Sequence, residues 1–78
     1  MNKIVIFVNG EKYELESNQV KVSKLIELGG GNKSEYELQL RRGEGGPIVE
    51  TYKDPEQILT VKNGTHFLTH LIVPVNPA

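Results

Sequence analysis

The stretch that decides the fold is IVIFVNGEKYELE, residues 4–16. Its first five residues are β-branched or aromatic, as in a buried strand, and its last five alternate polar and apolar side chains, as in a half-exposed strand. Between them stand Asn9 and Gly10, a pair that readily takes the positive φ angles of a type I′ turn. The stretch therefore predicts a β-hairpin with strands near 3–8 and 12–16.

A short helix is predicted after the hairpin, near residues 23–28. Four residues recur at the i, i+3, i+4 and i+7 spacing of one helix face: Val22, Leu25, Ile26 and Gly29. Ser23 stands where an N-cap belongs, and the three glycines at 29–31 end the helix. A helix of about two turns is not stable alone, so it must pack across the hairpin.

Three more strands are predicted, near residues 35–41, 48–52 and 65–73, because these segments alternate apolar and polar side chains or are rich in β-branched residues. The order strand-strand-helix-strand-strand-strand is that of the β-grasp fold. We therefore expect an α+β domain in which one short helix packs across a mixed sheet of four to five strands. The first and last strands, the most apolar ones, should lie parallel in the middle of the sheet.

Composition limits the function classes. The chain has 78 residues, no cysteine and a net charge of -1. Absent cysteines exclude disulfides and thiolate zinc sites, and the near-neutral charge argues against bulk binding to nucleic acid or an anionic membrane. No apolar run reaches signal-peptide or transmembrane length. We expect one domain over residues 1–73, a flexible tail over residues 74–78, a monomer and a cytoplasmic location.

In this order and spacing the chain resembles the ubiquitin-like proteins, and most closely the bacterial multiubiquitin-type group and its single-domain relatives. Three stretches carry the resemblance: residues 4–10, the helix start at Val22-Ser23, and residues 58–67, where an aliphatic strand piece is followed by Lys-Asn-Gly. The resemblance implies a bacterial protein modifier of a conjugation-type pathway, with no enzymatic activity of its own. Its implied partners are an adenylating enzyme, a transfer enzyme and a processing peptidase.

The tail departs from that family. Ubiquitin-like modifiers and sulfur carriers act through a flexible C-terminal diglycine, whereas residues 75–78 here are Val75, Asn76, Pro77 and Ala78. Glycine best suits a segment that must thread into a narrow active site. We therefore expect the tail either to be presented to an adenylating enzyme as it is or to be trimmed first by a peptidase, near Asn76. Two alternatives stay open: a β-grasp interaction module that is never conjugated, and a sulfur-carrier-like protein.

Candidate catalytic and metal-binding residues are few. His66 and His70 form a His-x-x-x-His pair, but on a strand they would lie roughly 13–14 Å apart, too far to share one ion. The chain has no cysteine nucleophile, and the glycine-rich segments 29–31 and 43–46 lack the Lys-Ser/Thr of a phosphate loop. We therefore expect no catalytic residue, no metal and no cofactor.

The last predicted strand offers a surface patch instead. If Phe67 faces the helix, alternate residues of that strand face outward, next to the third predicted strand. The patch would consist of Arg41, His66, Leu68, His70 and Ile72. Ubiquitin uses the corresponding outer sheet face for recognition, so the resemblance implies a partner-binding patch here. A one-residue change of strand phase would bury the patch instead.

Overall fold

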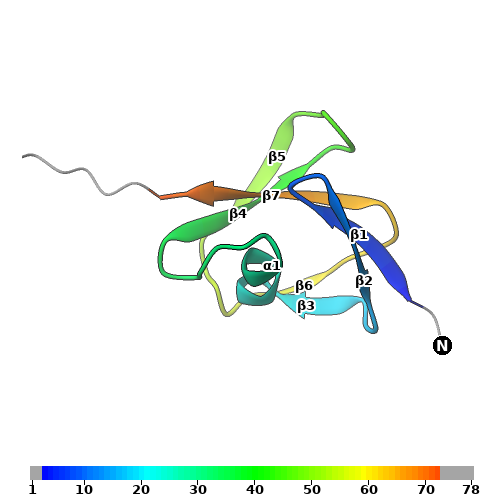
Figure 1. Ribbon diagram of the computed structural model, residues 1–78, viewed down its shortest axis with the longest axis horizontal. Coiled ribbons are helices and arrows are strands. Elements are labelled where there is room, and N and C mark those ends of the chain that lie inside the picture. Colours follow the sequence, from blue (N-terminus) through cyan, green and yellow to red (C-terminus); the bar gives the residue numbers. More distant parts are fainter. Residues whose placement is uncertain (1–2, 73–78) are drawn as a thin grey trace, which may run out of the picture.

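The structure, a computed structural model, describes residues 3–72. It contains a helix and seven strands: β1 (Ile4–Val8), β2 (Glu11–Leu15), β3 (Gln19–Lys21), α1 (Val22–Leu28), β4 (Tyr36–Arg41), β5 (Ile48–Tyr52), β6 (Ile58–Thr60) and β7 (Thr65–Leu71). Five strands form a mixed sheet in the order β2-β1-β7-β4-β5, and β3 pairs with β6 in a separate two-stranded sheet (Figure 1). The predicted α+β class, with a mixed sheet and one short helix, is confirmed.

The predicted hairpin is confirmed. β1 and β2 are antiparallel, with Val8 opposite Glu11 next to the turn. Asn9 and Gly10 have φ angles of 54° and 82°, the positive values that a type I′ turn requires. The Asn9 side chain also reaches β7, since its Oδ1 accepts the Thr69 N–H at 2.9 Å and its Nδ2 donates to Thr69 Oγ1 at 2.9 Å. The turn therefore joins the hairpin to the last strand.

The first and last strands lie parallel in the middle of the sheet, as predicted. Phe7 is opposite His66, and Val8 is opposite Phe67. Each of these strands has a neighbour on both sides, because β2 flanks β1 and β4 flanks β7. The core lies between the sheet and α1, and its buried residues come from β1, α1, β4, β6, the residue after β6, and β7: Ile6, Val8, Val22, Leu25, Ile26, Leu38, Leu59, Val61 and Phe67.

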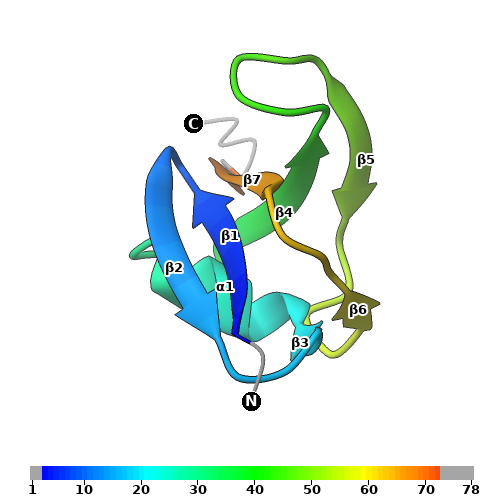
Figure 2. The same ribbon diagram turned by 90° about the vertical axis from the view of Figure 1, so that its right-hand side faces the viewer.

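The helix covers one face of the sheet, as Figure 2 shows, and it buries the apolar residues that its periodicity selects. The predicted N-cap at Ser23 is wrong. The cap position is Lys21, and no side chain bonds the free N–H groups there. Instead, the N–H groups of Val22 and Ser23 donate to the carbonyls of Gln57 and Pro55, at 2.9 and 3.0 Å. A distant backbone segment thus replaces the side-chain cap, which local sequence does not reveal.

The glycine segment ends the helix as predicted: α1 ends at Leu28, and the left-handed residue is the second glycine. Gly29 keeps a φ of −80°, and Gly30 takes the left-handed conformation with φ 90°. The hydroxyl of Tyr13, from β2, donates to the Leu28 carbonyl at 2.7 Å. This bond pairs one of the last helix carbonyls and fixes the helix to the hairpin.

The β3–β6 pair was not predicted. Val20 is opposite Leu59, and each strand has only three residues. This small sheet lies on the helix side of the five-stranded sheet (Figure 1, Figure 2). Across residues 3–72, no helix is long and apolar enough to cross a membrane. The predicted tail, residues 74–78, lies outside the described residues.

Candidate protein-binding face

The face of the five-stranded sheet opposite α1 is called the outer face below. Strand register decides which side chains it carries. His66 is opposite Arg41, and His70 is opposite Glu37, in the antiparallel β4–β7 pair. Phe67, between them in sequence, is only 2% exposed and belongs to the core. Since side chains alternate along a strand, Arg41, His66 and His70 lie on the outer face, with the phase that the sequence predicts.

An aromatic stack stands at the middle of the outer face. The rings of Phe7, from β1, and His66, from β7, are nearly parallel, with centroids 4.5 Å apart and an interplanar angle of 5°. The two residues are direct neighbours in the parallel pair. Leu68 follows two residues later on the same strand and is half-buried. Phe7, His66 and Leu68 therefore form a continuous apolar and aromatic centre.

Sequence reasoning did not place Phe7 in the patch. A signal was present, because Ile6 and Val8 are core residues and strand alternation then turns Phe7 outward. What the sequence lacked was the offset between β1 and β7. That offset puts Phe7 beside His66 and no other residue of β7, and it is a property of the folded sheet.

Basic groups flank the aromatic stack on both sides. Lys12, from β2, is opposite Phe7, and Arg41, from β4, is opposite His66. The row across the outer face is thus Lys12, Phe7, His66, Arg41. Arg41 is half-buried, and its Nε donates to the Gly46 carbonyl at 3.0 Å, which holds the guanidinium over the loop that follows β4. The row combines a flat aromatic centre with positively charged ends.

The outer face also carries carboxylates. Glu37 is opposite the exposed His70, further along β4 and β7. On β2, Glu14 is two residues from Lys12 on the same face, and it forms an ion pair with Lys3, with Nζ and Oε1 3.6 Å apart. Both side chains of that pair are more than half exposed, so the pair adds little to stability. Lys12 and Arg41 thus flank the stack directly, and the carboxylates of Glu14 and Glu37 lie further along the strands.

The remaining patch residue is at the end of β7. Ile72 is 46% exposed, and its N–H donates to the Glu35 carbonyl at 2.7 Å. Leu71, next to it, is 45% exposed although it belongs to the opposite face, so burial fades toward this end of the strand. The other residues predicted to act in the tail, Val75, Asn76, Pro77 and Ala78, lie outside the described residues.

Within residues 3–72, no three His, Asp or Glu side chains come together in a group that could hold a metal ion. His66 and His70 lie on one strand, with Leu68 between them on the same face. The arrangement on the outer face is suited to contact with another molecule through an apolar centre and a charged rim. Comparison with family models, with curated proteins and with solved structures gives no match to this chain.

Proposed function

We propose that this chain is a ubiquitin-like protein of the β-grasp class, and that other proteins recognise it through its outer face. The strand order supports the fold assignment, because β1 and β7 lie parallel at the centre and one helix packs on one side. The observation that carries the binding function is the Phe7–His66 stack, with its two rings 4.5 Å apart, in the middle of the outer face.

The chemistry of the patch favours a protein partner. Binding energy in protein interfaces concentrates in a few aromatic and arginine residues at the centre of the contact, surrounded by polar groups that exclude water. Phe7 and His66 provide such an aromatic centre, and Leu68 adds aliphatic area next to it. Arg41 and Lys12 supply the polar rim. A partner that presents an aliphatic side chain between acidic ones would match this surface.

Site-specific photo-crosslinking tests the proposal. A photoreactive phenylalanine analogue replaces Leu68 in one variant and Lys24, which lies on the helix, in a matched control. We expect the variant with the analogue at position 68 to form a covalent adduct with a discrete host protein. The variant with the analogue at position 24 should form no adduct with that protein. Adding Phe7→Ala to the first variant should reduce the adduct at least tenfold. Equal adducts from both positions would contradict recognition through the outer face.

Conjugation in a bacterial pathway is the second candidate, and the path of β7 favours it. β7 is a central strand, and its last described contact is the bond from Ile72 to Glu35. The described part of the chain therefore ends directly after a strand in the middle of the sheet. An adenylating enzyme could hold the patch and act on the segment that follows, after a processing peptidase has trimmed it near Asn76. A transfer enzyme would complete the pathway.

Two changes separate the candidates. Removal of residues 74–78 should abolish function if the tail is conjugated, whereas Leu68→Ala or Ile72→Ala alone should abolish it if the chain only docks. Intact mass of the chain, after co-expression with the genes that neighbour its own, gives the direct readout. A shortened chain or a protein adduct supports conjugation. A chain that keeps its full mass and forms no adduct rules conjugation out and leaves the interaction module.

A further inference from the structure

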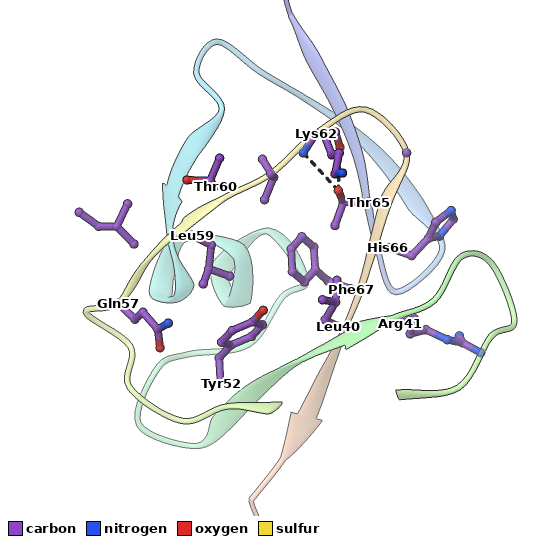
Figure 3. A pocket seen from close by; sticks show the side chains of 13 residues that line it. Leu40, Arg41, Tyr52, Gln57, Leu59, Thr60, Lys62, Thr65, His66 and Phe67 are labelled. Carbon is purple, nitrogen blue, oxygen red and sulfur yellow. Dashed lines mark hydrogen bonds between the residues drawn. The ribbon is translucent and has the colours of Figure 1, made fainter. Parts of the chain in front are cut away.

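A hollow of about 400 Å³ lies on the opposite side of the sheet from the outer face, between β4, β6 and the start of β7 (Figure 3). Four apolar or aromatic side chains point into it, from β4, β5, β6 and β7: Leu40, Tyr52, Leu59 and Phe67. Burial, and to a lesser extent the charge of Glu50, raises the pKa of the Tyr52 hydroxyl. The hollow therefore has an apolar floor that the helix does not cover.

One wall of the hollow is the backbone of β6. Residues 57–62 all line it, without a gap. Side chains alternate between the two faces of a strand, so six consecutive residues line one space when the strand presents its edge. The other edge of β6 is paired with β3, and in the described part of the chain β6 has no second neighbour.

Hydrogen bonds to the segment around β3 identify which β6 residues face that strand. The Gln57 carbonyl accepts the Val22 N–H at 2.9 Å, and the Val61 N–H donates to the Asn18 carbonyl at 2.7 Å. Both pairs continue the register in which Leu59 is opposite Val20. Hydrogen-bonded pairs alternate along an antiparallel ladder, so the residues that bond toward β3 are 57, 59 and 61.

By the same alternation, the backbone groups of Ile58 and Thr60 are directed away from β3. Their N–H and C=O groups lie along the edge that borders the hollow. Among residues 3–72, no donor or acceptor pairs with any of these four groups. Ile58 is also 59% exposed, the largest exposure among the large apolar residues of the described chain. An apolar hollow thus lies next to an unpaired strand edge.

We propose that this hollow binds an extended segment of a partner protein, which pairs with β6 as a third strand. Polypeptide backbone is the natural complement of an unpaired strand edge, and alternate side chains of an added strand enter neighbouring pockets. Here alternate apolar side chains of the segment fill the space above Leu59 and Phe67. The occupant is an extended backbone, because a globular ligand would leave the Ile58 and Thr60 groups unpaired.

Charge specifies the segment further. The charged side chains of the lining are Arg41 and Lys62, and both are basic. Arg41 points away from the hollow, whereas Lys62 stands at its rim above Thr65 (Figure 3). Among residues 3–72, no carboxylate belongs to the lining; the charge of Glu50 acts on the Tyr52 hydroxyl, in a part of the lining that is separate in sequence from Lys62. The segment therefore carries acidic residues between its apolar ones, and one of them pairs with Lys62. His66 also borders the hollow, but its ring points away from it and stacks on Phe7 (Figure 3), so this site does not depend on the function proposed for the outer face.

The probe for this site is a blocked seven-residue peptide in which valines alternate with glutamates. In ¹⁵N-resolved NMR spectra of the full chain, we expect its addition to shift the amides of Ile58 and Thr60 most. Amide exchange of the free protein should be fast at these two positions and slower at Leu59 and Val61. On peptide binding, exchange at Ile58 and Thr60 should slow. Slow exchange at both positions in the free monomer would overturn the proposal.

Three controls distinguish strand addition from binding through side chains alone. A peptide N-methylated at the two amides that face β6 loses both donors, so its affinity should fall about tenfold. Lys62→Glu should weaken binding several-fold at low salt, whereas Lys24→Glu should not. Leu68→Glu on the outer face should leave peptide affinity unchanged, so failure here is distinct from failure of the function proposed above. Equal affinity of the methylated peptide, absence of shifts at millimolar peptide, or a dimer that covers β6 would each refute the site.

Discussion

Strands β7 and β6 are joined by a short loop, yet they differ in strand pairing and in burial. β7 is paired on both sides, with β1 and with β4, and its Phe67 is 2% exposed. β6 is paired on one side only, and its Ile58 is 59% exposed. This contrast shows that the small domain concentrates its stability in the centre of the large sheet. The small sheet is held on one edge and leaves the other edge available for contact.

The largest expected effect comes from the centre of the sheet. Phe67→Ala removes a buried ring between the sheet and α1, and we expect it to lower the free energy of unfolding by about 3–5 kcal/mol. The matched change in β6, Ile58→Ala, should stay within about 0.5 kcal/mol, because that side chain is mostly in water. Urea unfolding followed by circular dichroism measures both. Comparable losses would mean that β6 contributes to the core as much as β7.

The next effect concerns the turn that joins the hairpin to β7. Asn9→Ala removes two hydrogen bonds to Thr69 and places alanine at a φ of 54°. We expect a loss of about 2–3 kcal/mol from these terms together. Asn9→Gly also removes the side chain but accepts the positive φ, so it should lose about 1–2 kcal/mol less. If both variants unfold at the same urea concentration, the turn conformation does not contribute to stability.

A smaller effect is expected where the hairpin meets the helix. Tyr13→Phe removes the hydroxyl that donates to the Leu28 carbonyl at 2.7 Å, and we expect it to lower stability by about 0.5–1.5 kcal/mol. Tyr52→Phe is the matched control near β6, since the Tyr52 hydroxyl has no hydrogen-bond partner within residues 3–72. Its thermal midpoint should remain close to that of the parent chain. If Tyr52→Phe lost more stability than Tyr13→Phe, the region near β6 would contribute more to stability than the contact between hairpin and helix, contrary to our expectation.

The smallest effect is a pH dependence near the small sheet. A hydrogen bond from Lys21, and then the charges of Lys21 and Lys33, lower the pKa of Glu56 from its usual value. A carboxyl whose pKa is depressed by folding stabilises the protein above its unfolded pKa, and this stability is lost as pH falls through the folded pKa. Stability should therefore decrease on acidification below about pH 4.5, partly through Glu56.

Glu56→Gln tests this by comparison of urea midpoints at pH 6 and pH 3. The variant should lose less stability between the two pH values than the parent chain does. Glu44→Gln, in the exposed loop after β4, is the control, because Glu44 makes no ion pair within the described residues. Its acid sensitivity should equal that of the parent chain. An identical pH response in Glu56→Gln would show that the Lys21–Glu56 pair, 3.1 Å between Nζ and Oε1, is not formed in solution.

Local patterns in the sequence predicted the elements that local physics controls. Asn9-Gly10 takes positive φ angles by its own preference, so the hairpin needs no long-range information. The helix follows from apolar periodicity and ends at the glycines. The phase of β7 follows from alternation once Phe67 is assigned to the core, and this places His66, His70 and Arg41 on the outer face.

Contacts between segments that are far apart in the sequence were not predicted from it. The helix start has no side-chain cap, because the backbone of residues 55 and 57 bonds the free N–H groups. The aliphatic strand piece at residue 58 matches β6, but the three-residue β3 and the β3–β6 pairing were not predicted, because strands this short carry too little periodicity. The contribution of Phe7 to the outer face likewise depends on the offset between β1 and β7.

The sequence by itself thus determined the hairpin, the helix, the strand alternation and the absence of thiol chemistry, since each depends on neighbours within a few residues or on composition alone. Tertiary structure alone decided that Phe7 stacks on His66 and that Ile58 and Thr60 leave an edge unpaired beside an apolar hollow. The physical reason is the same in both cases. Register and pairing between distant strands are set by burial of the whole core, and no short segment carries that information.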